Sequence, residues 1–440
     1  MHRNRNTWAI LSSISRRARE EPNLQFTSLA HLLNKGFLRD CYDSLDRNKA
    51  VGIDEVTWRE YGINLEKNLT DLVGRLKRKS YKPLPARRVY IPKDETSKRP
   101  LGISAIENKI VEKGITRILE SIFEEDFLQC SYGFRKNLNC HQALKELDNL
   151  IMTCPVNHIV EADIKGFFDN VKHNLILLAL KQRIADSSLL FLIERFLKAG
   201  YVEDGMLKKS DKGTPQGSVL SPMLANIFMH YVLDVWFENT VKPHVRGFCS
   251  LVRYADDFVI VVQYKKDAER IERALENRFR KYQLELHPDK SGRKSFGRYE
   301  RENADKQNRR PNTFDFLGFT HYCDKTRKGY FKLGRKTQNK KFKSKIKDLQ
   351  EWLKNVRNKV KVKDWWKTLR AKLRGHYQYY GISGNMPMLN YFHKIAMRLT
   401  YKWINRRSQK QSMYWKEFIE YLDKYPLPTP RIYHNLYTLT

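Results

Sequence analysis

The stretch YADDFVIVV at residues 254–262 decides how the rest of the chain is interpreted. It sets two adjacent carboxylates, Asp256 and Asp257, among apolar residues, so residues 250–263 predict two strands joined by a tight turn at Ala255–Asp257. Neighbouring carboxylates in an apolar hairpin repel each other and are costly to remove from water. A divalent cation would offset both costs, but a polar hairpin tip, where Asp is common, fits the pattern equally well.

A second acidic strand end favours the metal interpretation. VNHIVEADI at residues 156–164 is apolar and β-branched, and it predicts a strand with Asp163 at its carboxyl end. If this strand neighbours the hairpin, Asp163, Asp256 and Asp257 meet at one edge of a sheet. Three carboxylates there suit two Mg²⁺ ions roughly 3.5–4 Å apart, which would clamp the attacking and leaving oxygens of a phosphoryl transfer.

The charge of the chain indicates a polyanionic partner. Its 440 residues include 83 Lys and Arg against 49 Asp and Glu, which gives a net charge of +34, and 12% of the residues are aromatic. Residues 321–440 alone carry +22 of this charge and 21 of the aromatic residues. Basic side chains interleaved with aromatic ones suit phosphate neutralisation and base stacking, so nucleic acid is the expected partner. A helical bundle with an aromatic core and solvated lysines has the same composition.

The composition excludes other classes of protein. Hydrophobic residues make up 41% of the chain, enough for sizeable cores, and no window offers ~18 uninterrupted apolar residues, so no membrane partner is expected. None of the six cysteines forms a CxxC or CxxH pair, which argues against zinc and favours reduced thiols in the cytoplasm. Residues 1–19 carry five arginines and no acid, and this end favours an RNA-contacting helix over a transit peptide.

Hydrophobic periodicity outlines the remaining elements. Four prolines between Tyr81 and Pro100 predict extended strand and loop, and the polar, basic residues 291–312 predict a surface loop. Helices are predicted at residues 28–46, 63–79, 105–124, 221–238 and 338–359, and another from about residue 171.

Seven ordered motifs make the chain resemble the group II intron reverse transcriptases of the bacterial maturase type. YADD resembles the catalytic hairpin of that family, and ADIKGFFDNVKH at residues 162–173 is similar to its first catalytic aspartate motif. The other five are RRVYIPKDETSKRPLGI (87–103) for the fingers, SYGFR (131–135) for the turn after them, GTPQGSVLSPMLANI (213–227) for the template and nucleotide loop, FDFLGF (314–319) for the primer grip, and LRGHYQYYG (373–381) for the thumb or maturase domain. The resemblance covers the chain from about Leu29 to its C-terminus.

This resemblance implies an α+β fold, the right-hand polymerase, in which fingers and a palm with an antiparallel sheet precede an all-α thumb. The implied domains are a basic N-terminal extension at residues 1–27, an N-terminal motif and fingers at 28–155, a palm with the catalytic site at 156–320, and a helical thumb or maturase domain at 321–440.

The resemblance also implies a role for individual residues. Asp163, Asp256 and Asp257 would hold two Mg²⁺ ions, with Mn²⁺ as a substitute, while a primer 3′-hydroxyl attacks the α-phosphorus of a dNTP. Lys290, in HPDKS, would be the general acid for the leaving pyrophosphate. The implied nucleotide-binding residues are Lys93, Arg99, Phe168, Gln216 and Tyr254, and the implied primer grip is Phe316, Leu317 and Gly318.

Phe168 stands where the family places its steric gate against a ribose 2′-hydroxyl, five residues after Asp163. The alternative is that Phe168 belongs to the core and its neighbour Phe167 faces the site. For Lys93 and Lys290, the surrounding motif alone distinguishes them from ordinary solvated lysines.

Several positions depart from the family pattern. Glu55 stands where Gly is usual, Ser104 and Ala105 replace Pro and Thr, and Asn108 replaces Asp. The three catalytic carboxylates are intact, so an active polymerase is expected. No HNH endonuclease segment with cysteine pairs follows LPTPRIYHNLY at residues 427–437, so second-strand target cleavage is not expected of this chain.

The expected function is therefore that of an RNA-directed DNA polymerase that also binds its intron RNA and assists splicing and intron mobility. Its expected partners are an RNA template, the intron RNA, a DNA primer or target, and dNTPs, in a bacterial cytoplasmic ribonucleoprotein, and a homodimer is left open. Two alternatives remain: an RNA-binding splicing maturase with a minor polymerase role, and a domesticated reverse transcriptase of antiphage defence.

Overall fold

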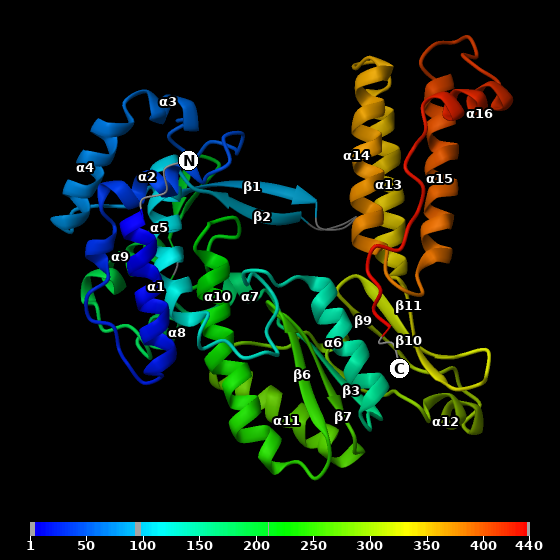
Figure 1. The fold of residues 1–440 in the computed structure, drawn as a ribbon, viewed down its shortest axis with the longest axis horizontal. Coiled ribbons are helices and arrows are strands. Elements are labelled where there is room, and N and C mark those ends of the chain that lie inside the picture. Colours follow the sequence, from blue (N-terminus) through cyan, green and yellow to red (C-terminus); the bar gives the residue numbers. More distant parts are fainter. Residues whose placement is uncertain (1–4, 93–97, 210, 438–440) are drawn as a thin grey trace.

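The computed structural model describes residues 5–92, 98–209 and 211–437, and this part of the chain has a mixed α+β fold, as expected. Figure 1 shows three regions side by side: a block of helices that contains the N-terminus, a central sheet, and a group of long C-terminal helices. In the described ranges, no helix is both long and apolar enough to cross a membrane.

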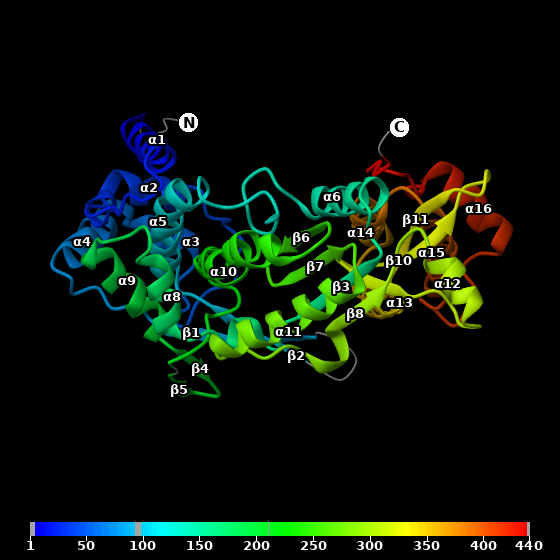
Figure 2. The ribbon, with the colours of Figure 1, turned by 90° about the horizontal axis from the view of Figure 1, so that it is seen from below.

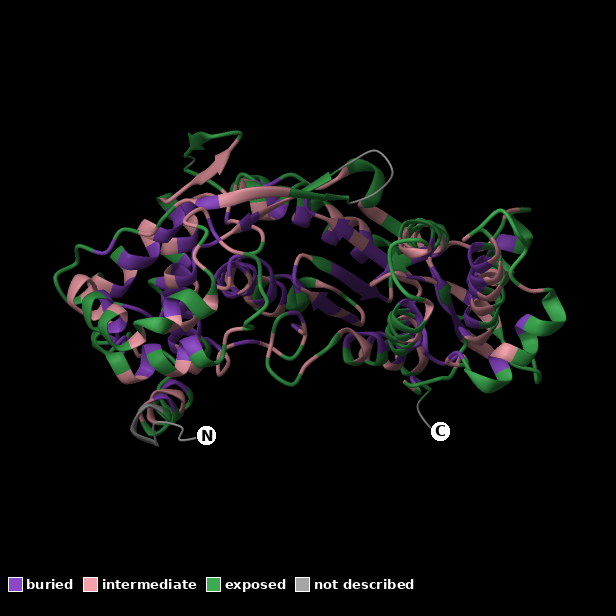
Figure 3. Cartoon of the chain, turned by 90° about the horizontal axis from the view of Figure 1, so that it is seen from above, coloured by how far each residue is buried: buried purple, intermediate pink, exposed green. Residues whose placement is uncertain are grey.

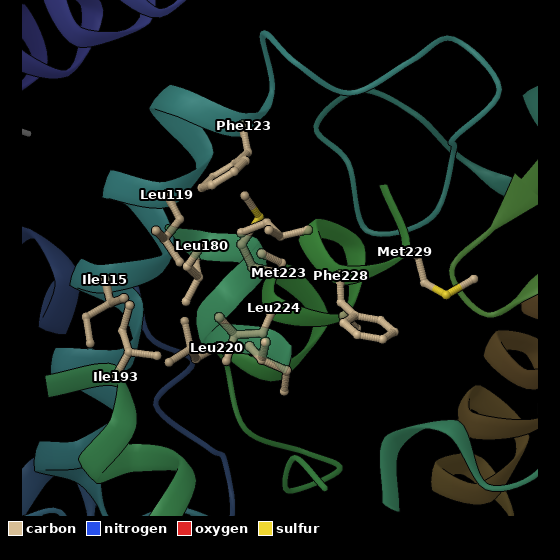
Figure 4. Packing of buried hydrophobic residues seen from close by; sticks show 14 of the residues in the cluster. Ile115, Leu119, Phe123, Leu180, Ile193, Leu220, Met223, Leu224, Phe228 and Met229 are labelled. Carbon is tan, nitrogen blue, oxygen red and sulfur yellow. The ribbon is translucent and has the colours of Figure 1, made fainter. Parts of the chain in front are cut away.

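The N-terminal block is built around one buried helix, α5. Twelve of its eighteen residues are buried, and it packs against α1 and α2. Figure 4 shows Ile115, Leu119 and Phe123 of α5 lying close to Leu180 and Met223, from two helices further along the chain. The helices of this block are α1 (Arg5–Glu20), α2 (Lys35–Asp43), α3 (Trp58–Ile63), α4 (Leu65–Lys77), α5 (Ile106–Phe123), α8 (His173–Leu180) and α9 (Ser187–Lys198).

An antiparallel hairpin, β1 (Ala86–Pro92) and β2 (Lys98–Ile103), projects from this block toward the C-terminal helices (Figure 1). It is buried at its root and exposed toward its tip, as the colours of Figure 3 show. β4 (Tyr201–Glu203) lies parallel to β1, and β5 (Met206–Lys208) completes this four-stranded sheet.

The central sheet is antiparallel throughout, with the strand order β6-β7-β3-β8. Its strands are β6 (Cys249–Tyr254), β7 (Asp257–Val262), β3 (His158–Asp163) and β8 (Gly292–Ser295). Figure 2 shows the sheet between α6 (Cys140–Thr153) and α11 (Lys265–Lys281).

The central sheet separates two hydrophobic cores, because successive side chains of a strand point to opposite faces. Phe258 and Ile260 of β7 join the core that contains α5 and α11. Val259 and Val261, between and after them, join a second core that includes α6 and the C-terminal helices. The sheet is therefore fixed from both sides.

Two predicted elements differ from the structure. Residues 291–312 do not form a surface loop: they contain β8, which pairs with β3, and α12 (Glu300–Lys306). β8 is polar because it is a four-residue edge strand whose side chains stay partly in solvent. The predicted helix at 221–238 is α-helical only as α10 (Ser221–Met229) and continues as two π-helical segments, η2 (His230–Asp234) and η3 (Phe237–Val241).

The C-terminal region begins with a sheet rather than a helix. Residue 321, the expected start of an all-α domain, lies inside β10 (Phe319–Lys325), and the first long helix starts at Asn339. The reason is local, since short segments of alternating polarity on either side of tight turns pair as strands. The other elements are β9 (Thr313–Phe316), β11 (Phe331–Thr337), α13 (Asn339–Val356), α14 (Val362–Tyr380), α15 (Met386–Asn405) and α16 (Trp415–Lys424).

Candidate active site

The YADD stretch forms the predicted hairpin. β6 ends at Tyr254, β7 begins at Asp257, and these two residues pair across the hairpin, which leaves Ala255 and Asp256 as the turn. On the other side of β7, Asp163 at the end of β3 pairs with Asp257. The two predicted strands are therefore neighbours, and the three aspartates lie at one edge of the central sheet.

The electrostatics of this edge reflect the crowding of like charges. The pKa of Asp257 is raised to about 7, first by burial and then by the negative charge of Asp256. Burial and, to a smaller extent, the charge of Asp163 raise the pKa of Asp256. The Asp257 side chain keeps a solvent-exposed surface, so the group remains open to an incoming ligand although protein surrounds it. Close carboxylates of this kind attract cations.

Lys290 supplies one positive charge at this edge. Its Nζ lies 2.6 Å from Oδ2 of Asp163. The backbone N–H of His287 also donates to the Asp163 carbonyl at 2.7 Å, which anchors the turn that carries Lys290. The Lys290 and Asp163 side chains are 55% and 38% exposed, so the ion pair contributes roughly 1 kcal/mol or less and is free to open.

The donor chemistry of the edge fits a divalent cation. Asp163, Asp256 and Asp257 offer only carboxylate oxygens, the ligands that Mg²⁺ prefers. Burial and, to a smaller extent, like-charge repulsion raise the pKa values of Asp256 and Asp257, and a bound cation would offset both. Within the described residues, however, no three side chains of the metal-ligating types converge closely enough to hold one ion, and Lys290 balances the charge of Asp163 instead.

The loop 213–217 connects the β1–β2 hairpin to the carboxylate edge. The N–H of Thr214 donates to the Phe168 carbonyl at 2.7 Å, and the N–H of Gly102 on β2 donates to the Gln216 carbonyl at 2.6 Å. A Cβ on Gly217, whose φ is +109°, would lie 2.8 Å from the Gly102 oxygen, so only glycine fits this close approach.

The loop also places the side chain of Gln216 near the candidate site. Its amide donates to the Asp169 carboxylate at 3.3 Å. Asp169 belongs to α7 (Phe167–Asn170), the short helix that follows β3 and Asp163. Gln216 is therefore held at the side of the edge where the chain leaves β3.

The two neighbouring phenylalanines of α7 have different surroundings. Phe167 is 3% exposed and packs against Phe228. Phe168 is only half-buried and touches Phe167 edge to face, with ring centroids 5.3 Å apart. Phe168 is thus the ring of the two that keeps a surface available to a ligand, although its role stays a prediction.

Cationic side chains of the hairpin and of α13 lie close to one another near this edge. Arg99 of β2 is exposed, and its charge opposes the rise in the pKa of Asp256. Burial lowers the pKa of Lys341 of α13, and the nearby charges of Lys345, Arg99 and Lys290 lower it further. Lys341 was not predicted from the sequence, where it is one lysine in a run of lysines. Lys93 lies outside the described residues.

The FDFLGF motif forms a turn that touches the carboxylate edge. Phe316 is buried, and Leu317 and Gly318 form the turn between β9 and β10 with φ values of 49° and 80°. The backbone N–H of Leu317 lies near the Asp257 carboxylate and counteracts the rise in its pKa. On its other side, the Leu317 carbonyl accepts a hydrogen bond from the hydroxyl of Tyr379 at 3.0 Å.

Tyr379 therefore links α14 to the edge through this turn, a link that sequence reasoning missed. Its ring stacks on Phe319 of β10, with ring centroids 6.1 Å apart, and His141 of α6 contacts its carbonyl at 2.8 Å. The LRGHYQYYG motif contains Tyr379, but nothing in that motif indicates which residue it contacts.

Comparison with known proteins agrees with this geometry. Residues 91–321 match the family described as reverse transcriptase (RNA-dependent DNA polymerase). The chain is 34% identical over 247 residues to protein YkfC of Escherichia coli K12. The aligned segment covers 49% of this chain and 64% of that protein. It is 38% identical over 226 residues to the group II intron-encoded protein LtrA of Lactococcus lactis, covering 51% of this chain and 37% of that protein.

A more distant relative is nuclear intron maturase 4, a mitochondrial protein of Arabidopsis thaliana. It is 26% identical over 221 residues, covering 48% of this chain and 26% of that protein. The matched segments thus span less than two thirds of the length of each of these relatives.

Proposed function

Because the chain belongs to the reverse transcriptase (RNA-dependent DNA polymerase) family, we propose that it is an RNA-directed DNA polymerase of the group II intron type. The observation that carries the proposal is the pairing of Asp163 with Asp257 across β3 and β7, with Asp256 in the adjoining turn. This edge of the sheet lies next to an exposed arginine and an exposed lysine, and such a combination suits the transfer of a nucleotide from a triphosphate.

In this proposal Asp163, Asp256 and Asp257 hold two Mg²⁺ ions, with Mn²⁺ as a substitute. When bound, the ions lower the pKa of the primer 3′-hydroxyl and neutralise charge on the transferred phosphoryl group. The chain contributes by fixing the three carboxylates on adjacent strands, so that little reorganisation is needed when the ions and substrates bind.

The cations around the edge are proposed to bind the triphosphate. Arg99, on the exposed part of the hairpin, has the planar guanidinium that suits bidentate phosphate contact, and Lys93 belongs to the same hairpin motif. Lys290 is proposed as the general acid for the leaving pyrophosphate. Its ammonium group already lies at the edge, 2.6 Å from Asp163, and its exposure leaves it free to turn toward a phosphate.

The residues around the incoming nucleotide are proposed to set its position and its sugar. Gln216 would contact the nucleotide and template from the loop that joins the hairpin to α7. Tyr254, half-buried beside the turn, and Phe168 would line the nucleotide on its other sides. A half-buried Phe168 ring is suited to pack against a deoxyribose and to clash with a 2′-hydroxyl.

The three regions of the fold are proposed to act as a right-hand polymerase. The N-terminal block with its β1–β2 hairpin corresponds to fingers, the central sheet to the palm, and the helices from Asn339 onward to the thumb (Figure 1). The turn of Phe316, Leu317 and Gly318 lies against Asp257 and would grip the primer end there.

A role in splicing is proposed as part of the same function. Two relatives carry names that connect them with introns, a group II intron-encoded protein and an intron maturase. Residues 321–440 hold +22 of the net charge of +34, and a surface so basic suits binding of a structured RNA. The proposed setting is a bacterial cytoplasmic ribonucleoprotein with the intron RNA.

Primer extension with dNTPs and Mg²⁺ on an RNA template tests the polymerase proposal. Asp256→Asn keeps the size of the side chain and removes its charge, so extension should be abolished while binding of the primer–template is largely kept. The matched control is Asp204→Asn, an exposed turn residue with a φ of 51°, which asparagine tolerates, and it should extend normally. Substantial primer extension by a folded Asp256→Asn variant would contradict the assignment of Asp256 as a catalytic carboxylate.

A further inference from the structure

Arg253, the residue immediately before the YADD turn, is a fully buried cation whose hydrogen bonds are all made. It is 0% exposed. Its Nε donates to Asp234 at 2.7 Å and one Nη donates to the other Asp234 oxygen at 2.5 Å. The remaining donors reach the Asn226 side chain at 3.1 Å, the Ser131 hydroxyl at 2.7 Å and the Ala255 carbonyl at 2.9 Å. All five guanidinium N–H groups are therefore used.

This network is not explained by stability alone. A buried ion pair loses so much hydration that apolar residues of similar volume often stabilise a fold equally well. Asp234 is also 0% exposed, and the pair lies among the apolar residues of the first core. The buried Arg253–Asp234 pair therefore calls for an explanation other than its contribution to stability.

The helix that supplies the two main partners has a rare geometry. Asn226 lies in α10 and Asp234 ends the π-helical segment η2. In a regular α-helix, residues eight positions apart are rotated by about 80° around the axis. A π-helix turns less per residue, because its hydrogen bonds span five residues rather than four, so the segment brings Asp234 back toward the face of Asn226. Both side chains thereby reach Arg253.

The network ends on the turn that carries Asp256. Ala255 has a φ of 60°, a conformation that residues other than glycine seldom adopt and that the surroundings must hold in place. Arg253 holds the Ala255 carbonyl. Gly133 also lies against this turn, since a Cβ there would come 2.3 Å from the Ala255 nitrogen. Asn226 connects Arg253 with Gly133, because its amide also donates to the Gly133 carbonyl at 2.6 Å.

We propose that Arg253, itself oriented by Asp234, is a positioning residue that sets the conformation of the Ala255 turn and thereby the place of the Asp256 carboxylate. It acts through the backbone and touches no substrate. The inference rests on the proposed polymerase function, in which Asp256 is one of the metal-binding carboxylates. A displacement of about 1 Å at such a group lowers reaction rates by about a hundredfold.

The test compares two isosteric changes that each remove the anion of a buried Arg–Asp pair. Asp234→Asn loosens Arg253 under the turn. Asp148→Asn is the matched control, because Asp148 is also buried and bonds to the buried Arg335 at 2.5 Å, but that pair joins α6 to β11. Arg253→Lys is the second variant: an ammonium has three donors and does not serve the four partner residues of the guanidinium.

Single-turnover primer extension over a range of dNTP and Mg²⁺ concentrations, with melting temperatures and primer–template Kd measured alongside, separates the outcomes. We expect both Asp→Asn variants to melt at lower temperature. Only Asp234→Asn and Arg253→Lys should lose ten- to a hundredfold in rate, with dNTP KM and primer–template Kd within about threefold of the parent and a higher Mg²⁺ concentration at half-maximal rate.

Three outcomes would overturn the inference. In the first, both Arg253-network variants fold and extend within threefold of the parent. In the second, Asp148→Asn loses as much rate as Asp234→Asn. In the third, both network variants fail to fold while Asp148→Asn folds, which would make the network a stability element. A parent chain that does not extend primers at all would instead overturn the proposed function.

Discussion

Replacing Tyr379 by Phe would remove a single hydroxyl and test whether the C-terminal helices act on the carboxylate edge. The hydroxyl donates to the Leu317 carbonyl, and the N–H of Leu317 in turn lies near the Asp257 carboxylate and acts on its pKa. Leu317 has a φ of 49°, and a left-handed conformation costs a non-glycine residue about 1–2 kcal/mol. One neutral hydrogen bond contributes about 0.5–1.5 kcal/mol, so the Tyr379 bond offsets much of this cost.

Loss of that bond should make the native turn roughly two- to tenfold less favoured, since ~1.4 kcal/mol corresponds to a factor of ten. If Asp257 follows the turn, the rate of nucleotide addition falls by up to the same factor. We expect Tyr379→Phe to lower the single-turnover rate within that range and to leave primer–template Kd within twofold.

Tyr380→Phe is the matched control, because Tyr380 is the adjacent ring of the same helix, is 6% exposed, and its hydroxyl has no hydrogen-bond partner among the described residues. It should keep the parental rate. An equal loss in both variants would refute the reasoning, and so would an unchanged rate in Tyr379→Phe. A loss confined to primer–template affinity would place the effect in nucleic-acid binding and remove the link to Asp257.

Three further predictions concern the sugar, the pH and the salt. Phe168→Val should lower the preference for dNTP over rNTP in kcat/KM by one to two decades, because the clash of a 2′-hydroxyl with the Phe168 ring is worth about 1–3 kcal/mol. The same drop in Phe167→Val instead would assign the steric gate to Phe167. The pKa of Asp257, about 7, lies above that of an unfolded carboxyl, so its contribution to stability is complete below about pH 4 and is lost as the pH rises through 7. The melting temperature in metal-free buffer should therefore fall between pH 5 and pH 8, and an unchanged fall in Asp257→Asn would contradict this account. Replacing the exposed Lys340 and Lys343 of α13 by Gln should make primer–template binding less sensitive to salt. The slope of log affinity against log salt concentration should become shallower by about one unit for each phosphate that is no longer neutralised. An unchanged slope would exclude this face of α13 from nucleic-acid binding.

The carboxylate edge could be predicted because its signals are local. Apolar strand-forming residues on both sides of Asp256 and Asp257 predict a hairpin with these two residues at its turn. Asp163 lies at the end of a strand of the same apolar composition. From the sequence alone, the three carboxylates meet only if the strand that ends at Asp163 lies beside the hairpin. In the structure β3 does pair with β7. The order of fingers, palm and thumb that the motifs imply stays a prediction.

The supports of the edge could not be predicted, because they join residues far apart in sequence. Arg253 meets Ser131 across 122 positions, and Tyr379 meets Leu317 across 62. The π-helical turn that brings Asp234 to Arg253 has no periodicity distinct from that of the α-helix before it. β8 was missed for a similar reason, since a short polar edge strand lacks the alternation that marks a buried one.

The two-sided burial of the central sheet has a consequence for how the chain can be divided. The segment that matches the reverse transcriptase family stops at residue 321, two residues into β10. Val259 and Val261 share their core with residues well beyond that point, such as Leu369 and Trp365 of α14. A fragment cut at 321 would expose the apolar residues of this core to water and leave the remaining residues of β10 without β11, the strand that pairs along their other side, and such surfaces aggregate. The smallest soluble piece of this chain with an ordered carboxylate edge should therefore include the C-terminal helices.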